Sequence, residues 1–405
     1  NFKKNKMKCK ITNDSLSPFM SFGKMPSANG FLDKKDFDNE FFYEMEVGFS
    51  EKVSLLQLNE YSNPVKVHNE RYPFYTSSSL NMKKHFNQFA HWLKEKYLQN
   101  GSKLVEVGSN DGTLLENFKN SNINAIGFEP SKTIAELANK KNVKTLSKFF
   151  NTQNLDEVKN FHSSVDVICS ANVIAHIPDL KDVIKSVDKL LSSKGLLIFE
   201  EPYLGSMFSK VSYDQIYDEH IFMFSVSSIS KIFDLFDFEL IDVLPQITHG
   251  GSMRYVIGRK NKHKKSEKIS KFLDEEQNKR LDTIESCLDF KKACELSKKM
   301  TIEKLKKFKS NNKKICGYAA TAKSTTVLNY CDIGKDLIDY ICDTTSEKIG
   351  KFSPGVHIPI VSMNHFKDNI PDVAFLFAWN HKEEIFLKEK EFKKNGGAWF
   401  SHVTL

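Results

Sequence analysis

The chain has 405 residues, of which 40% are hydrophobic and 27% are charged. This length is too great for one ordinary compact domain, and this composition excludes a disordered chain. The formal net charge is +8, which suits an anionic small-molecule substrate. Because no zinc finger, RNP motif or compact arginine cluster accompanies this charge, we expect no nucleic acid partner.

The sequence holds no apolar run near the roughly 20 residues of a membrane span, so we expect no membrane partner. The N-terminal segment NFKKNKMKCK lacks the apolar core of a signal peptide. Seven cysteines are scattered along the chain without a CxxC pair, which favours reduced, mostly buried thiols. We therefore expect a cytoplasmic protein.

The first 70 or so residues are predicted to be irregular, with short strand-like pieces such as VSLLQL. A long helical pattern follows at 80–98, and strands and helices then alternate. The predicted strands are 102–109, 124–130, 165–171 and 195–202, the predicted helices are 112–120, 131–141 and 180–191, and a hairpin closes the unit at 237–259. Alternation of this kind predicts a parallel α/β sheet.

The second half of the chain begins with a Lys- and Glu-rich stretch of helical spacing, which predicts a helical connector. A second α/β unit starts at KKICGYAATAKS. Its predicted strands lie near 313–318, 337–342, 373–378 and 397–401. The whole pattern divides the chain into four segments, 1–79, 80–262, 263–310 and 311–405.

A cofactor pocket is predicted where the first strand of the 80–262 segment ends. The sequence LVEVGSNDG places five residues in a strand-to-helix turn: Glu106, Gly108, Asn110, Asp111 and Gly112. Small residues let the backbone approach a ligand, and the following helix N-terminus offers free N–H groups. A plain structural turn is the alternative.

Glu129 ends the second strand, roughly 20 residues beyond Gly108. A carboxylate there can accept both ribose hydroxyls of an adenosine. The loop is not GxGxxG, and the acidic Glu106 and Asp111 suit a cationic ligand better than a pyrophosphate. S-adenosylmethionine, with its sulfonium and ammonium, fits. Asn172 and His176 follow a later strand, at the sheet edge where open α/β sheets bind ligands; His176 at a helix start without a role is the alternative.

Several motifs occur in one order along the chain: EVGSNDG, GFEPS, ANVIAHIPD, EEPY, YDQIYDEH, HGGSMRY, GYAATAKSTTVLNY, FSPGVHIPI and AWNHKEEI. In this order they resemble the sugar C-methyltransferase family, over nearly the whole chain from about residue 70. The resemblance implies an α/β protein. Its parts are a small N-terminal domain (1–79), a Rossmann-like class I methyltransferase domain (80–262), a helical connector (263–310) and a C-terminal Rossmann-like domain that binds a nucleotide-sugar (311–405).

The reaction implied by the resemblance is methyl transfer from S-adenosylmethionine to a carbon beside the ketone of a nucleotide-diphosphate keto-deoxysugar, through an enolate. A ketone is chemically necessary, because an isolated sugar C–H is far too weak an acid. An O- or N-methyltransferase acting on a nucleotide-linked sugar stays open, and so does a non-catalytic nucleotide-sugar-binding protein. The intact EVGSNDG loop and DEH triplet count against the latter. The sequence does not identify the nucleotide base, the sugar, the methylated position or the oligomeric state.

The segment YDQIYDEHIFMFS carries an unusual density of titratable groups, which favours a site over a solvated loop. The resemblance implies that His220 is the base and that Glu219 and Tyr217 orient it or the substrate. Asp218 stands where the family more often has a histidine. A purely structural His220 is the alternative.

Four further residues are candidate substrate ligands. His249, before a glycine pair, binds substrate or is a plain turn histidine. Tyr72 and Tyr75 match a family segment that carries a substrate-site tyrosine. Lys323, in the AATAK turn, could pair with a phosphate beside a helix N-terminus, and a scaffold domain without a ligand is the alternative.

The family's N-terminal domain usually carries four zinc cysteines in two CxxC pairs, and a tetrahedral site needs a full ligand set. This chain has Cys9 alone, with Ser50 and Val53 at the second pair. We therefore expect no metal, unless His68 or another residue supplies ligands. Apolar packing should stabilise this domain, with five candidate residues: Phe19, Phe22, Phe31, Phe41 and Phe42.

Overall fold

The computed structural model describes residues 7–16, 18–61 and 75–405. The N-terminal part forms an antiparallel sheet in the order β11-β5-β4-β3 and a small pair of strands, β1 and β2. The strands are β1 (Met7–Lys8), β2 (Ser15–Leu16), β3 (Pro18–Pro26), β4 (Phe42–Ser50), β5 (Leu55–Leu58) and β11 (Phe222–Met223). Strand β11 belongs to the middle of the chain, so the N-terminal sheet is completed by a residue pair from the next segment.

A seven-stranded sheet forms the centre of the next segment, in the order β12-β13-β10-β9-β6-β7-β8. Strand β13 runs antiparallel to both of its neighbours, and the pairs from β10 to β8 are parallel. The strands are β6 (Lys103–Val107), β7 (Asn124–Phe128), β8 (Thr145–Leu146), β9 (Val165–Ala171), β10 (Leu191–Pro202), β12 (Phe238–Gln246) and β13 (Ser252–Arg259). This confirms the predicted parallel sheet with its closing hairpin.

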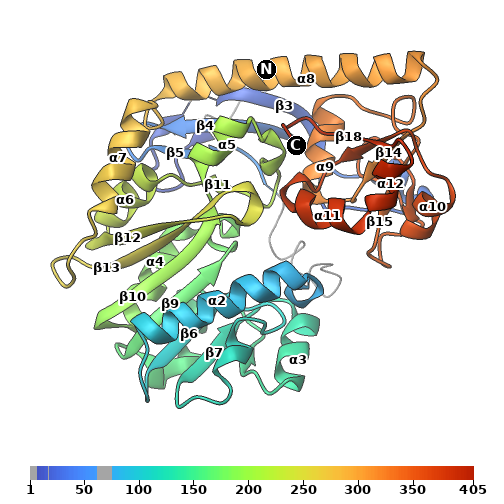
Figure 1. Cartoon of the computed structure of the whole chain (residues 1–405). Helices are drawn as coiled ribbons and strands as arrows, with labels where there is room; N and C mark the ends of the chain where they lie inside the picture. The colour runs from blue at the N-terminus through green and yellow to red at the C-terminus, as the bar shows by residue number, and fades with distance from the viewer. Residues whose placement is uncertain (1–6, 17, 62–74) are drawn as a thin grey trace.

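Helices cover both faces of this sheet, and alternate residues of each strand face opposite cores. On β10, for example, Leu197 and Phe199 pack in one core and Leu196 and Ile198 in the other. Helix α2 lies across the second face (Figure 1). The helices are α2 (Leu80–Lys96), α3 (Lys132–Lys140), α4 (Leu180–Leu190), α5 (Leu204–Lys210) and α6 (Val226–Asp234).

Two helices, α7 (Lys268–Asn278) and α8 (Ile284–Ser310), connect this sheet to the C-terminal unit. Helix α8 runs along the top of the molecule in Figure 1, from α7 to the C-terminal sheet. One of its faces packs against the N-terminal sheet: Phe290 and Cys294 share an apolar core with Met45 and Leu56. The predicted connector is therefore helical, and it is also a wall of the N-terminal core.

The C-terminal unit is a parallel sheet in the order β16-β15-β14-β17-β18. Its elements are β14 (Ile315–Tyr318), α9 (Ala322–Tyr330), β15 (Tyr340–Asp343), β16 (Ile360–Ser362), α10 (Met363–Asp368), β17 (Val373–Leu376), α11 (Lys382–Lys388), α12 (Lys390–Lys394) and β18 (Ala398–Phe400). Strand order reverses between β14 and β17, which is the point where open α/β sheets form a ligand crevice.

Three sequence-based expectations need correction. The described part of the first 70 residues is not irregular, because β3 and β4 pair as long antiparallel strands with two register shifts. The helix expected at 112–120 is only a 3-10 turn, Leu115–Phe118, since the Asn117 amide donates to the carbonyls of Thr113 and Leu114 and competes with helical bonds. Phe41 and Phe42 are 62% and 42% exposed, so they do not stabilise the N-terminal core, whereas Phe19 and Phe22 are buried there.

All seven cysteines are buried and unpaired, as predicted for thiols of this distribution. No helix in the described ranges is both long and apolar enough to cross a membrane.

Candidate functional site

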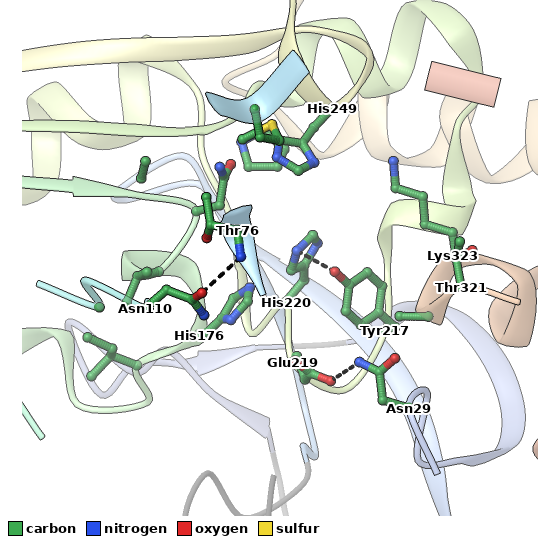
Figure 2. A pocket seen from close by; sticks show the side chains of 18 of the residues that line it. Asn29, Thr76, Asn110, His176, Tyr217, Glu219, His220, His249, Thr321 and Lys323 are labelled. Atoms are coloured by element: carbon green, nitrogen blue, oxygen red, sulfur yellow. Dashed lines mark hydrogen bonds between the residues drawn. The ribbon is translucent and has the colours of Figure 1, made fainter. Parts of the chain in front are cut away.

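One cavity of about 350 Å³ lies where the three parts of the chain meet, a volume within the roughly 300–1,000 Å³ of small-molecule sites. The middle segment contributes the carboxyl ends of β6, β7, β9 and β10. The N-terminal part contributes Asn29, and the C-terminal unit contributes the turn before α9 and the turn after β17. Figure 2 shows Asn29, His220 and Lys323 from these three parts around the same space.

The turn after β6 has a backbone that only certain residues can adopt. Gly108 has φ +69°, and a Cβ there would lie 2.4 Å from a methyl of Val173. Asn110 has φ 47° and its side-chain oxygen accepts from the N–H of Thr76, so it ties the segment before α2 to the cofactor turn. Gly108 and Asn110 both line the cavity.

Glu129 lines the same cavity from the end of β7. Its carboxylate accepts from the N–H of Asn110 at 3.1 Å and from the N–H of Ser131 at 2.8 Å. Burial raises the pKa of Glu129 to about 7, although these two N–H donors act in the opposite direction. A carboxylate held in this way is oriented to accept ribose hydroxyls.

Three predicted cofactor residues do not line the cavity. Glu106 is buried within β6, and Gly112 has φ +80° and packs against Val143. Asp111 accepts from the N–H of Ser77 and the hydroxyl of Thr113. These contacts shape and anchor the turn, and the expectation that the three residues bind the cofactor stays a prediction.

Asn172 and His176 line the cavity after β9. Asn172 has φ 58°, and within the described part of the chain its buried side-chain oxygen has no hydrogen-bond partner. Sequence reasoning missed Glu201, whose carboxylate accepts from the N–H groups of Val173 and Ala175 and so holds this loop. Burial raises the pKa of Glu201 to about 8. Its position at the end of a predicted strand was the available signal.

His220 projects into the cavity opposite His176, with ring centroids 5.1 Å apart (Figure 2). Its Nδ1 lies 2.7 Å from the Gln215 carbonyl oxygen, which can only accept, so Nδ1 carries a proton. Its Nε2 lies 2.8 Å from the Tyr217 hydroxyl. Burial lowers the pKa of His220 to about 4, so at neutral pH the ring is neutral and the unprotonated Nε2 accepts a hydrogen bond from the Tyr217 hydroxyl.

The two carboxylates beside His220 face different surroundings. Glu219 lines the cavity and accepts from the amide of Asn29 at 2.6 Å. Asp218 accepts from the Ser27 hydroxyl and the Ala28 N–H, so it fastens this segment to the N-terminal part and does not line the cavity. Asn29 carried no local sequence signal, because its role depends on a contact with a residue far along the chain.

Lys323 lines the cavity from the first turn of α9, where Thr321 caps the helix. Its ammonium lies 3.3 Å from the Asn380 side-chain oxygen and 5.1 Å from the centre of the Trp379 ring. Burial lowers the pKa of Lys323, and Asp214 opposes this effect. His381, which sequence reasoning missed, lines the cavity after Asn380.

His249 also lines the cavity, and its backbone has φ 53°. Burial lowers the pKa of His249 well below the ordinary histidine value, and the positive charge of Lys323 lowers it further. Tyr75 is described but does not line the cavity, whereas its neighbour Thr76 does. Tyr72 lies outside the described residues, as does His68.

The residues at the expected zinc site do not fit the metal. Cys9 is fully buried, and its sulfur accepts from the N–H of Thr12 at 3.5 Å. Val53 packs with Cys9 and Ile11 in an apolar core. Among the described residues no group of three or more His, Cys, Asp or Glu side chains could hold a metal ion, and a structural zinc ion needs four ligands.

Three family models match the chain in succession. They are a zinc binding domain at residues 9–67, a methyltransferase domain at 55–243 and a C-methyltransferase C-terminal domain at 247–403. The C-methyltransferase NovU of Streptomyces niveus is 28% identical over 393 residues, which cover 96% of this chain and 93% of the relative.

Solved structures that resemble the chain cover less than half of it in the examples that follow. Magnesium protoporphyrin IX methyltransferase of Synechocystis with bound SAH is 14% identical over 44% of this chain and 83% of its own, with a TM-score of 0.36. The YcgJ protein of Bacillus subtilis is 13% identical over 44% of this chain and 100% of its own, with a TM-score of 0.35. The succession of family models and the full-length relative support the C-methyltransferase family that the motifs of the chain resemble, and the chain is an S-adenosylmethionine-dependent methyltransferase.

Proposed function

We propose that this C-methyltransferase acts on a nucleotide-diphosphate keto-deoxysugar and methylates a carbon next to its ketone through an enolate. One observation carries the proposal. The cofactor turn, a histidine with an unprotonated ring nitrogen and a buried lysine at a helix N-terminus line one cavity. The reaction needs a methyl donor, a proton acceptor and a cationic group that binds the anionic part of the substrate. These three features match those needs.

The cofactor end fits S-adenosylmethionine in the chemistry of its groups. Glu129 offers an oriented carboxylate for a ribose diol, Gly108 leaves room for close backbone approach, and Asn172 offers an unpartnered oxygen. When bound, S-adenosylmethionine supplies an electrophilic methyl group on a sulfonium.

The proton acceptor is His220. Its Nε2 takes the proton from the carbon beside the ketone, and the C–H electron pair forms the enolate, whose carbon is then the nucleophile. The Gln215 carbonyl keeps the other ring proton on Nδ1 and so presents the lone pair on Nε2. Tyr217 lies 2.8 Å from this nitrogen and keeps its hydroxyl proton, because burial raises the pKa of Tyr217 well above its usual range. Its hydroxyl can therefore move from His220 to the developing enolate oxygen as a donor.

The anionic part of the proposed substrate is its diphosphate, which we assign to Lys323. Lys323 is only 8% exposed, and among the described residues no carboxylate lies within ion-pair distance of it, so its charge is available to a ligand. The N–H groups at the start of α9 add a partial positive charge beside it. The turn before α9 lines the same cavity as the cofactor turn, which supports this assignment.

Replacement of His220 tests the proposal. His220→Asn keeps one polar contact but cannot accept the proton, so methyl transfer to a panel of nucleotide-linked keto-deoxysugars should fall by about 10² to 10⁴-fold. The affinity for S-adenosylmethionine, measured by calorimetry, should stay near that of the wild type. His365→Asn is the matched control, because His365 is exposed and lies outside the cavity.

Hydrogen exchange separates carbon from heteroatom methylation. In heavy water the wild-type protein should exchange the substrate hydrogen beside the ketone, and His220→Asn should lose this exchange. A fully active variant, or a wild-type protein that methylates its substrate without exchange, would contradict the enolate mechanism and favour oxygen or nitrogen methylation.

A further inference from the structure

The C-terminal end of the chain reaches the turn that carries the proposed base. The 3-10 turn η6 (Tyr213–Gln215) immediately precedes the Tyr217–His220 segment. Within it, Asp214 is fully buried, and its two carboxylate oxygens meet two residues of the C-terminal unit. Trp379 donates its ring N–H to one oxygen at 2.7 Å, and Nε2 of His402 lies 3.1 Å from the other.

The pair of Asp214 and His402 is shielded from water, since both side chains are 0% exposed. Burial alone would raise the pKa of Asp214, but the neighbouring His402, Lys323 and Trp379 hold it below its usual value. A buried carboxylate of this kind depends on its partners, and removal of one leaves an uncompensated charge.

The same unit also holds the other side of the turn. The Thr326 hydroxyl, on α9, donates to the carbonyl of Ile216 at 2.8 Å. Gln215 therefore lies between two residues that the C-terminal unit fixes, and its carbonyl accepts from Nδ1 of His220. The Gln215 carbonyl sets the tautomer of His220. Its two sequence neighbours, Asp214 and Ile216, are thus both held by residues of the C-terminal unit.

We infer that His402 is a positioning residue, which holds Asp214 and the η6 turn so that the Gln215 carbonyl presents His220 to the cavity. The inference rests on the proposed role of His220 as base. It also gives a reason for the placement of Trp379: this residue contacts Asp214 with its ring N–H, while its ring faces the Lys323 ammonium. The diphosphate end of the cavity and the base are then linked through one buried side chain.

Substitutions at His402 test this role in the full-length protein. His402→Phe keeps a ring of similar size but leaves one Asp214 oxygen without its partner. We expect kcat to fall by about 10²-fold, the cost of a small misplacement of a catalytic group, with an unchanged dissociation constant for S-adenosylmethionine. His402→Gln, whose amide can donate to Asp214, should keep most of the activity.

A readout independent of the reaction comes from NMR of ¹⁵N-histidine-labelled protein. The Nδ1–H signal of His220, assigned by its absence in His220→Asn, should disappear or shift in His402→Phe and persist in His402→Gln. The matched control is His357→Phe, because His357 pairs with Glu40 at another junction between the N- and C-terminal parts, away from η6. This control should change neither the signal nor kcat.

An unchanged His220 signal in folded His402→Phe would overturn the inference, as would a loss of activity that only follows the loss of folded protein. If His402→Phe does not fold, Thr326→Val decides instead, since it frees the other side of the same turn and should alter the same signal. These experiments distinguish a failure of this inference from a failure of the proposed function. If His220 is not the base, His220→Asn stays active, and the NMR comparison still shows whether His402 positions the η6 turn.

Discussion

Glu129 combines two properties that make cofactor binding depend on pH. In its proposed role the ionised carboxylate accepts the ribose hydroxyls, yet burial raises its pKa to about 7. We therefore expect the affinity of the free protein for S-adenosylmethionine to fall as the pH falls below 7. Glu129→Gln should weaken binding about ten- to a hundred-fold at pH 8, the loss expected for hydrogen bonds to a charged acceptor.

Calorimetry at pH 6 and pH 8 checks this prediction, with exposed Glu136 on α3 changed to Gln as the control. The pH dependence should vanish in Glu129→Gln. An unchanged dissociation constant in that variant would remove Glu129 from the cofactor site.

Glu201 makes a separate prediction about stability. Its pKa is raised from the ordinary 4.5 to about 8 by burial, so between these values the folded protein holds a proton that the unfolded chain has lost. The contribution of Glu201 to the free energy of unfolding is fully present below about pH 4.5. It falls by about 1.4 kcal/mol per pH unit as the pH rises toward 8. Glu201→Gln keeps the acceptor for Val173 and Ala175 and removes the titration.

Urea unfolding at pH 6 and pH 8 measures this effect. Between pH 6 and pH 8, the free energy of unfolding of the wild-type protein should fall by about 2–3 kcal/mol more than that of Glu201→Gln. Parallel pH curves for the two proteins would show that Glu201 is ionised in the folded state at pH 6.

At the scale of elements, the junction between α7 and α6 depends on one buried carboxylate. Glu276 on α7 is fully buried and accepts from the N–H groups of Val226 and Ser227, at the start of α6, and from the hydroxyl of Tyr203. Glu276→Ala leaves two buried N–H donors and the Tyr203 hydroxyl without this partner. We expect a loss of about 3–5 kcal/mol of unfolding free energy by urea titration.

The control for this substitution is Glu275→Ala, on the same helix but partly exposed. It should cost far less, because exposed surface substitutions usually change stability little. Equal effects of the two variants would mean that helix propensity, and not the bonds to α6, determines the loss.

The N-terminal strands show why the long antiparallel strands of this segment were not predicted. In β4, Tyr43, Met45 and Val47 are buried and alternate with more exposed residues, which is the period of a half-buried strand. The signal was present, but it spans only Phe42–Val47, and the alternation ends at Gly48. The strand–helix alternation of the middle segment was predicted because each strand there carries a continuous apolar run, which burial on both faces requires.

At the scale of the whole molecule, the N-terminal part is stabilised by a core that it shares with α8 and the C-terminal unit. Cys9 and Val53 also pack with residues of the seven-stranded sheet. This packing supports the prediction that the purified protein contains no stoichiometric zinc and that a chelator leaves its melting temperature unchanged. One zinc per chain by elemental analysis after dialysis would contradict it.

The sequence by itself determined the two parallel α/β sheets, the order of their strands along the chain, and the residues that lie in the site by virtue of a strand end. Gly108, Glu129, Asn172 and Lys323 belong to this group, and all line the cavity. They were predictable because the carboxyl ends of parallel strands meet at one edge of the sheet. This arrangement does not depend on contacts with residues that are distant in the sequence.

Only the tertiary structure decided the contacts that set the chemistry of these groups. Asp218 faces Ser27 and Ala28 instead of the cavity, Asn29 holds Glu219, and His402 reaches Asp214 from the far end of the chain. None of these pairs shares a local pattern, because partners brought together by packing can lie at any separation in the sequence. The pKa of His220 depends on burial by all three parts of the chain, so no single segment of the sequence determines it.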